Sequence, residues 1–404
     1  MIARLFPAAL RGEVTTPPSK SDAQRLLIAA WLAGDIDRVQ LNGAQSADIA
    51  ACVRCLHALS NPEPCLDCGD SGAVLRFLTP VAAALGGARM TGSHQLAARP
   101  MGALLHALAE NGCRVSGGSL PFAVSGGLRG GVYALPGDVS SQFISGLLFA
   151  LPLLSGSSEL IVTGERESAS YLDLTLRALA DFGVVPRQSA GGWTVLPQPC
   201  RRPGLVRVEG DWSNAAPWLC LGALGGESVT VTGMDMDSLQ GDKAICQVLT
   251  RMGARISVTG DRVTALWGRR TPADIDAKDI PDLVPVLAAV AAATPGTTRI
   301  TGAARLRLKE SDRLETTARA LSALRGQVEQ TEDGLIIQGR AALEGGRVDA
   351  AGDHRIAMAA AVASGACTGP VVVTGAQAVE KSYPTFWKSL RALGKEVEED
   401  PFGP

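Results

Sequence analysis

Positively charged residues stand where helices are expected to begin, which is an unusual place for them. A helix N-terminus carries a partial positive charge and unpaired N–H groups, so each cation there costs about 0.3–1 kcal/mol unless an anion compensates it. Arginine grips phosphate and carboxylate groups with two parallel hydrogen bonds, and lysine supplies a compact charge. One or two shared anionic ligands would explain the set, whereas ordinary ion pairs at helix ends would explain it without a ligand. The cations are Lys20, Arg25, Arg99, Lys309, Arg313, Arg355 and Lys381.

Neutral hydrogen-bond donors extend this pattern. Ser140, Ser141 and Gln142 stand at the start of an apolar run, and side chains of this kind hold phosphate groups at helix N-termini. The chain has no Gly-x-x-x-x-Gly-Lys-Ser/Thr segment, so hydrolysis of nucleoside triphosphates is not indicated. The residues therefore favour an enzyme for small phosphorylated and carboxylated substrates, with salt-bridged helix ends as the alternative.

A repeat of about 70 residues sets out the elements that must position these groups. Aspartates precede apolar runs at positions 70, 138, 211, 282 and 353, and Thr-Gly pairs begin at 91, 163, 232, 301 and 374. A further start signal, Lys20-Ser21, opens the first of six copies. Such a period indicates one supersecondary unit used repeatedly, and six units predict two domains of three units each.

Each copy predicts a strand, a helix, a second strand, a second helix and one or two further strands. The first helices, such as 139–154 and 283–294, are almost wholly apolar and should be buried on all sides. The second helices are amphipathic and end in glycine, which favours a place nearer the surface. We therefore expect a two-domain, inside-out α/β (α+β) fold, barrel-like, with buried helices and outer sheets. The second helices are 171–183, 243–253 and 313–326, two of the strands are 157–164 and 297–302, and hairpins are 115–124 and 326–339.

The domain boundary is expected near residues 207–210, between the third and fourth copies. The strand before Pro17 belongs to no copy, and we expect it to pair with the second domain. Both domains supply anion-gripping residues, so substrate should relieve repulsion among them and favour domain closure. The expected parts are an N-terminal lobe of residues 18–208, a C-terminal lobe of residues 1–17 plus 209–404, and a hinge near 17–18 and 208–210.

Composition excludes several classes of protein. The 404 residues are 46% hydrophobic and carry a formal net charge of −2, which argues against a general nucleic-acid or acidic-membrane surface. The longest apolar stretches, such as 143–154, are shorter than the ~18 residues that a membrane span needs. Residues 1–13 lack the long apolar core of a signal peptide. We expect a cytoplasmic protein without membrane or nucleic-acid partners.

Nine cysteines include two Cys-x-x-Cys pairs, at 52–55 and 65–68. The pairs look like a zinc ribbon, but their separation is short, and Cys52 and Cys55 share one face of an apolar helix expected over 48–59. Buried thiols that act as small hydrophobic side chains are the favoured interpretation. The odd count also argues against a disulfide framework.

Taken in order, the motifs of the chain resemble those of the EPSP synthase (5-enolpyruvylshikimate-3-phosphate synthase, or 3-phosphoshikimate 1-carboxyvinyltransferase) family. The resemblance covers essentially the whole chain, and the ordered set is specific although several motifs are weak alone. The motifs are Pro-Ser-Lys-Ser (18–21) with Arg25, Gly-Asp-Ser-Gly-Ala-x-x-Arg (69–76), Arg99-Pro100, Ser-Ser-Gln-Phe (140–143), Ser168-x-x-Tyr171, Ser-x-Gln-Gly-Asp (238–242), Ile-Pro-Asp (280–282), Lys-Glu-Ser-Asp-Arg (309–313), Asp-His-Arg (353–355) and Lys381.

The resemblance implies two domains of three βαβαββ units each, which agrees with the repeat. It implies transfer of the enolpyruvyl (carboxyvinyl) group of phosphoenolpyruvate to the 5-hydroxyl of shikimate 3-phosphate, with release of phosphate, in the shikimate pathway to chorismate and the aromatic amino acids. These two small molecules are the implied partners. The resemblance implies no metal and no organic cofactor, and we expect a monomer.

The resemblance also assigns catalytic roles. Asp282 would take the proton from the 5-hydroxyl as general base, although an aspartate beside a proline can equally cap a helix. Glu310 would deliver or shuttle the proton at the phosphoenolpyruvate methylene with Lys20 close by, although a first-turn glutamate can equally belong to a capping box. Such chemistry needs an acid and a base whose environments push their pKa values apart.

The remaining site residues are implied by their positions in the motifs. Gln142 would touch both ligands, and Gly72 would let the backbone approach closely. Tyr171 is expected beside the phosphate ligands, His354 either orients its neighbours or is a satisfied helix-start histidine, and Arg76 is expected to be structural. The implied ligands of shikimate 3-phosphate are Lys20, Ser21, Arg25, Ser140, Ser141, Gln142, Ser168, Asp282 and Lys309, and those of phosphoenolpyruvate are Lys20, Gly72, Arg99, Gln142, Arg313, Arg355 and Lys381.

Two rival functions stay open. A UDP-N-acetylglucosamine enolpyruvyl transferase shares the fold and the donor, but that family usually uses a cysteine in a mobile loop, whereas the nearest candidate here, Cys113, follows a helix end. In a non-catalytic anion-binding protein on the same scaffold, the carboxylates of Asp282 and Glu310 would weaken the binding of anions.

Near Gly72, Ala73 replaces the threonine usual in the family, which leaves the response to glyphosate open.

Overall fold

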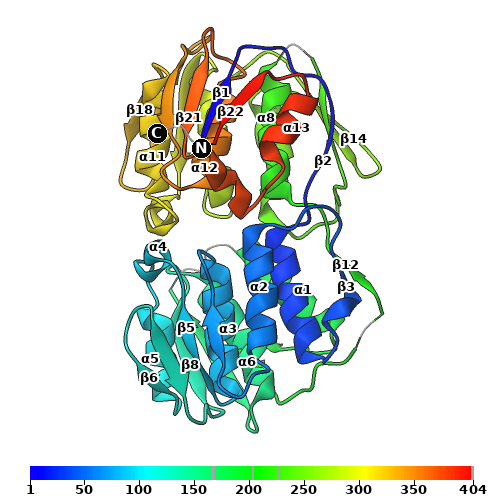
Figure 1. The fold of residues 1–404 in the computed structure, drawn as a ribbon, viewed down its shortest axis with the longest axis vertical. Helices are drawn as coiled ribbons and strands as arrows, with labels where there is room; N and C mark the ends of the chain where they lie inside the picture. Colours follow the sequence, from blue (N-terminus) through cyan, green and yellow to red (C-terminus); the bar gives the residue numbers. More distant parts are fainter. Residues whose placement is uncertain (165–168, 203, 226, 402–404) are drawn as a thin grey trace. The chain divides into compact units, whose positions relative to one another are not determined.

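The chain folds into two compact units in the computed structural model, which describes residues 1–164, 169–202, 204–225 and 227–401. What we call the C-terminal unit comprises Met1–Pro18, Gly43–Ser46 and Glu209–Pro404. The N-terminal unit comprises Ser19–Asn42 and Ala47–Val208. The chain therefore starts in the unit in which it also ends (Figure 1).

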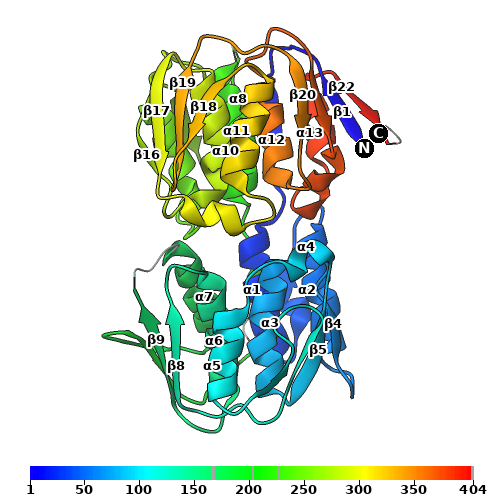
Figure 2. The same ribbon diagram turned by 90° about the vertical axis from the view of Figure 1, so that its left-hand side faces the viewer.

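The C-terminal unit contains three four-stranded sheets around its helices (Figure 2). The two strands at the start of the chain are built into two of these sheets. One pairs antiparallel with β21 and β22, and the other pairs parallel with β13. In order across each sheet, the strands are β20 (Gly346–Asp349), β21 (Val371–Thr374), β1 (Ile2–Leu5) and β22 (Val397–Asp400); β14 (Arg255–Thr259), β15 (Arg262–Leu266), β13 (Val229–Thr232) and β2 (Gly12–Thr15); and β16 (Ile275–Asp276), β17 (Gly296–Thr301), β19 (Leu335–Gly339) and β18 (Gln327–Gln330).

Three apolar helices fill the centre of the C-terminal unit. Every residue of α8 (Trp212–Leu224), α10 (Val284–Ala292) and α12 (His354–Ala363) is buried, as expected for helices that are apolar on all sides. The amphipathic helices keep an exposed face, and short 3-10 turns precede or connect several helices. These elements are α9 (Ile245–Arg251), α11 (Arg313–Ala323), α13 (Phe386–Ala392), η3 (Gly241–Ala244), η4 (Pro281–Leu283), η5 (Ala304–Leu308) and η6 (Ala376–Lys381).

The N-terminal unit repeats this plan with one smaller sheet. Two sheets have four strands, whereas the third has two described strands that pair in parallel. The strands are β4 (Cys65–Asp67), β5 (Gly87–Thr91), β7 (Phe122–Ser125) and β6 (Arg114–Ser116); β10 (Arg187–Ser189), β11 (Gly192–Val195), β9 (Ser158–Thr163) and β8 (Val132–Pro136); and β12 (Val206–Arg207) and β3 (Val39–Gln40). The helical elements are α1 (Lys20–Leu32), η1 (Ile36–Arg38), α2 (Ala47–Ala58), α3 (Gly72–Ala84), α4 (His94–Ala97), α5 (Gly102–Glu110), α6 (Ser141–Ala150), η2 (Leu151–Leu153) and α7 (Ala169–Asp181).

The predicted α/β fold with interior helices and outer sheets is confirmed within each unit. The apolar run 283–294 forms α10, the strand predicted at 297–302 is β17, and the hairpin predicted at 326–339 is the antiparallel pair β18 and β19. The two-stranded third sheet differs from six equal units. The reason lies in the first copy, where only residues 59–64 separate α2 from β4 and leave no room for the hairpin that follows the second helix in other copies.

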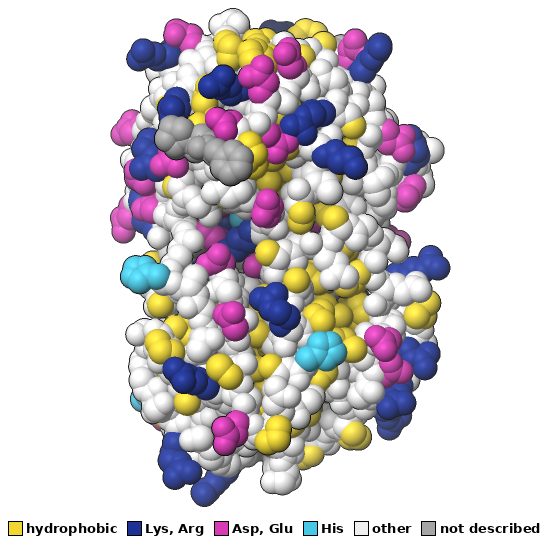
Figure 3. Space-filling model, viewed as in Figure 1, with side chains coloured by type: hydrophobic (Ala, Val, Ile, Leu, Met, Phe, Trp, Pro, Cys, Tyr) yellow, Lys and Arg dark blue, Asp and Glu magenta, His cyan; other side chains and the backbone are white. Residues whose placement is uncertain are grey.

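On the face in Figure 3, acidic and basic side chains are interspersed over each unit rather than gathered by sign. Within the part of the chain that the structure describes, no helix combines the length and apolar character needed to cross a bilayer. Cys52, Cys55 and Cys68 are buried, and Cys65 is exposed. No group of three or more metal-ligating His, Cys, Asp or Glu side chains occurs among the described residues.

Candidate active site

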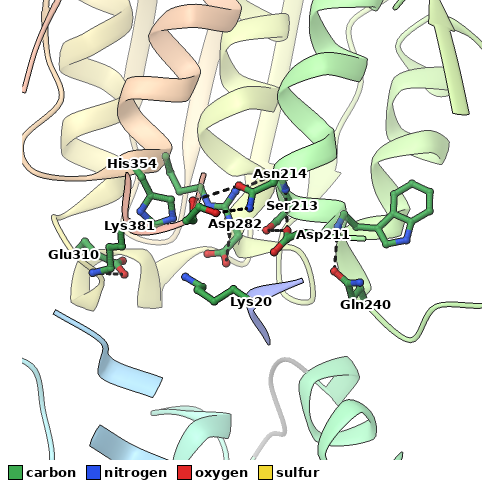
Figure 4. A network of polar contacts seen from close by, with 12 residues as sticks. Lys20, Asp211, Ser213, Asn214, Gln240, Asp282, Glu310, His354 and Lys381 are labelled. Carbon is green, nitrogen blue, oxygen red and sulfur yellow. Dashed lines mark hydrogen bonds and ion pairs between the residues drawn. The ribbon is translucent and has the colours of Figure 1, made fainter. Parts of the chain in front are cut away.

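The C-terminal unit concentrates charged side chains where its helices begin. Asp353 is the N-cap residue of α12 and accepts a hydrogen bond from the backbone N–H of Arg355 at 2.9 Å. Asp211 caps α8 by accepting from the N–H of Asn214 at 2.9 Å and from the hydroxyl of Ser213 at 2.7 Å. These caps hold the starts of two buried helices, and with them the side chains that follow (Figure 4).

Arg313, the first residue of α11, joins three carboxylates. Its Nε donates to Asp353 at 2.7 Å, Nη1 donates to Asp282 at 2.7 Å, and Nη2 donates to Glu310 at 2.6 Å. The guanidinium is buried, with a side chain only 2% exposed. Burial by itself would lower the pKa of Arg313, but the three carboxylates outweigh it and raise the pKa above its ordinary value.

Both predicted catalytic carboxylates are held between two cations. Asp282 accepts from Arg313 through Oδ1, and its Oδ2 lies 3.8 Å from Nη2 of Arg355. Glu310 accepts from Arg313 through Oε2, and its Oε1 lies 3.3 Å from Nζ of Lys381 (Figure 4). These contacts fix both carboxylates in place, which suits groups that must be oriented toward a substrate.

Asp282 does not have the capping role that was the alternative interpretation. It lies inside η4, whose N-cap residue is Ile280, and the following helix α10 has Leu283 at its N-cap. Likewise Ser71, and not Asp70, is the N-cap residue of α3. Asp70 instead accepts a hydrogen bond from Ser93. Two aspartates that looked like helix start signals are therefore not N-cap residues.

Arg355 and His354 are buried at the start of α12. Arg355 donates to the carbonyl oxygen of Ser213 at 2.8 Å and to the hydroxyl of Ser213 at 2.5 Å, which ties α12 to α8. The His354 Nδ1 lies 3.7 Å from Oδ1 of Asp353, and the ring is 1% exposed. This separation is longer than a hydrogen bond, so the orienting role of His354 stays a prediction.

Two further groups near Asp282 have displaced pKa values. Burial, helped by the charge of Asp282, raises the pKa of Asp242 to about 8. Burial lowers the pKa of Lys309 to about 8, against the opposing attraction of Asp282. A carboxyl group that holds its proton and an amine that releases its proton near neutral pH are groups that enzymes use at proton-transfer sites. Sequence reasoning identified Lys309 but did not identify Asp242, although Asp242 ends the Ser-x-Gln-Gly-Asp motif.

Several predicted residues of the N-terminal unit lie at the starts of α1, α3 and α6, whereas Arg25 is the sixth residue of α1 and Arg99 follows α4. Lys20 is the first residue of α1, and its Nζ lies 3.2 Å from Oδ2 of Asp48 in α2. Ser140 caps α6 by accepting from the N–H of Gln142 at 3.3 Å. Ser141 follows as the first residue of that helix. Asp48 was not predicted, and the signal was present as an aspartate in the first turn of an apolar helix.

Arg25 is buried on the inner side of α1. Its Nε donates to the hydroxyl of Thr175 at 2.8 Å, and its Nη1 donates to the carbonyl oxygen of Ser21 at 2.7 Å. The guanidinium carbon lies 4.9 Å from the ring centroid of Phe77 and 5.8 Å from that of Tyr171. Burial lowers the pKa of Arg25 to about 10, so the group keeps its charge at neutral pH.

Gly72 and Arg99 are immediate neighbours in space. A Cβ atom at Gly72 would lie 2.7 Å from Cζ of Arg99, which is too close for the guanidinium to keep its place. The backbone of the α3 start and the Arg99 side chain therefore share one small region. Of the remaining predicted residues, Tyr171 lies beside Arg25, and Ser168 lies outside the described residues.

Comparisons with known proteins agree on one family. The sequence profile described as EPSP synthase (3-phosphoshikimate 1-carboxyvinyltransferase) matches residues 6–390. Proteins named 3-phosphoshikimate 1-carboxyvinyltransferase are 42% identical in Clostridium kluyveri, over 97% of each chain, and 38% identical in Clostridium novyi, over 99% of each chain. A solved structure of EPSP synthase from Acinetobacter baumannii superposes with a TM-score of 0.76 at 25% identity, over 98% of this chain and 100% of the other.

Proposed function

Since this chain belongs to the EPSP synthase (3-phosphoshikimate 1-carboxyvinyltransferase) family, we propose that it transfers the carboxyvinyl group of phosphoenolpyruvate to the 5-hydroxyl of shikimate 3-phosphate and releases phosphate. It is a transferase of the shikimate pathway, which leads to chorismate and the aromatic amino acids. Neither a UDP-N-acetylglucosamine acceptor nor a purely anion-binding role is favoured, because the curated relatives share the 3-phosphoshikimate 1-carboxyvinyltransferase name over nearly their whole length.

The proposed chemistry is an addition followed by an elimination. Asp282 removes the proton of the 5-hydroxyl as its oxygen bonds to C2 of phosphoenolpyruvate, and Glu310, with Lys20, supplies a proton to C3. Cleavage of the C2–O bond to phosphate and loss of a proton from C3 then restore the double bond. One carboxylate must therefore accept a proton while the other donates one, and Glu310 must act in both directions.

The observation that supports this assignment is that Asp282 and Glu310 both accept hydrogen bonds from one arginine, Arg313. Arg313 holds both carboxylates at hydrogen-bond distance, 2.7 Å and 2.6 Å, so that they occupy defined positions on either side of one guanidinium. Two fixed carboxylates, each further balanced by a second cation, provide the acid and the base that the reaction needs.

The substrate-binding residues fall into two groups on this proposal. Phosphoenolpyruvate is gripped by Lys20, Gly72, Arg99, Gln142, Arg313, Arg355 and Lys381. Shikimate 3-phosphate is held by Lys20, Ser21, Arg25, Ser140, Ser141, Gln142, Ser168, Asp282 and Lys309. The lobes of residues 18–208 and of residues 1–17 plus 209–404 are thus both required for turnover, with Tyr171 and His354 in supporting roles and without a metal or organic cofactor.

The test is an assay of phosphate release from purified protein. Release is expected only when phosphoenolpyruvate and shikimate 3-phosphate are both present, with the carboxyvinyl ether as the second product by mass spectrometry. Release with UDP-N-acetylglucosamine in place of shikimate 3-phosphate would reverse the choice of acceptor. Binding of both anions without any release would favour the non-catalytic alternative.

We further propose that the enzyme acts in the cytoplasm as a monomer, without nucleic-acid or membrane partners. The interspersed surface charge supports this view, since neither sign gathers into a patch on the face in Figure 3. Light scattering coupled to size-exclusion chromatography should give a mass near 41.8 kDa, and twice that mass would contradict the monomer.

A further inference from the structure

Arg76 makes contacts that go beyond a structural ion pair. It lies in α3, is 5% exposed, and donates from Nη1 to Oε1 of Gln142 at 2.8 Å and from Nη2 to the carbonyl oxygen of Pro100 at 3.1 Å. Its guanidinium carbon lies 5.2 Å from the ring centroid of Phe143. Arg76 therefore connects the helix that starts at Gly72 with the start of α6 and with the residue that follows Arg99.

The chemistry of the two side chains determines how Gln142 is oriented. A guanidinium has only donors, whereas a carboxamide has one acceptor oxygen and an NH2 group with two donors. Gln142 must therefore turn its oxygen toward Arg76, and its NH2 group must point away from it. Gln142 is partly exposed and is the second residue of α6, where the N–H groups of the helix start also favour an acceptor or an anion.

The packing of α3 against α6 makes this contact possible. Gly146 of α6 lies against α3 so closely that a Cβ atom there would be 2.9 Å from Cγ of Pro80 and 3.2 Å from the carbonyl carbon of Arg76. Because the helices approach at a glycine, the long side chain of Arg76 can lie along the interface and reach Gln142 one turn earlier in α6.

We infer that Arg76 is a positioning residue that fixes the Gln142 carboxamide with its NH2 group toward the substrate. The inference rests on the proposed function in one respect, that Gln142 binds a substrate. It adds that Gln142 acts as a donor and not as an acceptor, and that this choice is imposed by Arg76. A ligand oxygen that accepts hydrogen bonds is therefore selected at this place over a ligand N–H group that can only donate.

The first experiment tests the orientation without removing Arg76. Gln142→Glu keeps an acceptor for Arg76, so the fold should be retained, but it replaces the two donors by a carboxylate oxygen. The KM of the substrate bound there should rise at least tenfold, and by more than in Gln142→Ala, with a change in kcat of less than threefold. A Gln142→Glu enzyme with wild-type KM values would show that the oxygen of Gln142 faces the substrate and would overturn the inference.

The second experiment is a double-mutant cycle between the two residues. Arg76→Met should raise the same KM that Gln142→Ala raises, by about fivefold or more, and Arg76→Lys should recover part of that loss. In the Gln142→Ala background Arg76→Met should add less than twofold, because it acts through Gln142. A full additional effect in that background, or unchanged KM values in Gln142→Ala, would overturn the inference.

A matched control separates positioning from stability. Arg270 likewise donates to two carbonyl oxygens, those of Ala293 and Ala341, and its partial burial in the C-terminal unit lowers its pKa. Arg270→Met should lower the midpoint of thermal unfolding without changing either KM. All variants are compared with wild-type enzyme that is active in the phosphate-release assay, so a failure of the proposed function would appear in the wild type and not only in these variants.

Discussion

Two buried arginines, one in each unit, are held by different kinds of partner. In the C-terminal unit, Arg313 donates to three carboxylates, those of Asp282, Glu310 and Asp353. In the N-terminal unit, Arg25 donates to a hydroxyl group and a backbone carbonyl. Carboxylates neutralise the charge of the first guanidinium, whereas neutral oxygens leave the charge of the second in place.

This difference indicates that the two arginines have different roles. Cations that hold carboxylates fix the positions of those carboxylates, as groups that must be oriented toward a substrate require. A cation held by neutral oxygens is positioned but still attracts an external anion, as phosphate binding requires. Cations at helix starts can also be balanced by the protein's own carboxylates, as Lys20 is by Asp48 and Arg313 is by three carboxylates.

The largest expected effect on activity follows from removing the proposed general base, Asp282. Asp282→Asn keeps the shape of the side chain and loses the ability to accept a proton, so kcat for phosphate release should fall about a thousandfold or more. Binding of shikimate 3-phosphate, measured by calorimetry, should persist within about tenfold. Asp279→Asn, an exposed position three residues earlier, should keep wild-type kcat. Appreciable turnover in Asp282→Asn would require a different base.

Removal of the two arginines should affect stability to different extents. Arg313→Met removes the shared partner of three carboxylates, of which Asp282 keeps Arg355 and Glu310 keeps Lys381, and should lower the free energy of unfolding by about 3–5 kcal/mol. Arg25→Met leaves neutral oxygens and should lower it by about 1–3 kcal/mol. The three carboxylates of Arg313→Met would have raised pKa values, so the folded state would bind extra protons and the variant would regain stability as pH falls.

Urea unfolding at pH 5 and pH 8 measures the loss of stability in Arg313→Met and in Arg25→Met. The deficit of Arg313→Met should shrink at pH 5, and that of Arg25→Met should stay nearly constant. Equal deficits with equal pH dependence would remove the distinction between the two units.

Crowding at Gly72 should affect binding in the N-terminal unit only. Gly72→Ala places a methyl group where Arg99 now lies, so the guanidinium must move and the KM of phosphoenolpyruvate should rise about tenfold or more. The free energy of unfolding should change little, because the end of an arginine side chain is flexible. Gly102→Ala is the matched control, since Gly102 also begins a helix but has open space where the methyl group of an alanine would lie. An unchanged KM in Gly72→Ala would remove Arg99 from the phosphoenolpyruvate site.

The smallest expected effect concerns Asp242 in the C-terminal unit. Its pKa of about 8 in the folded protein lies above the ~3.9 of an unfolded aspartate. The folded state therefore binds the proton more tightly, and this residue lowers stability progressively as pH rises from about 4 to about 8. The stability advantage of Asp242→Asn over wild type should therefore grow between pH 5 and pH 8, by about 1 kcal/mol or more. A gain that is equal at both pH values would show that Asp242 does not titrate in this range.

The repeat allowed much of the architecture to be predicted. Apolar runs after each start signal became buried helices, and Thr-Gly pairs marked the ends of strands such as β9 and β17. These features are local, because hydrophobic periodicity and turn residues act over a few neighbouring positions. The reduced sheet of β3 and β12 could not be foreseen, since its two strands are far apart in the chain.

The site was predicted as a set of residues but not as a set of contacts. Motif resemblance named Asp282, Glu310 and Arg313 separately, and nothing in their spacing showed that one guanidinium joins the two carboxylates. Ser213 and Asp242 were not predicted because a serine or an aspartate near a helix start has many ordinary roles. Their significance depends on Arg355 and on Asp282, which lie far away in sequence.

The sequence by itself determined which segments become helices and strands, which helices are apolar enough to be interior, and which family the motifs resemble. The tertiary structure alone decided the partner of each charge: Asp282 faces Arg313 instead of capping a helix, and Arg76 turns the amide of Gln142. The physical reason is the range of the interactions. Helix and strand preferences are set by neighbours in the chain, whereas ion pairs and hydrogen bonds depend on atoms that only folding brings within about 3 Å of each other.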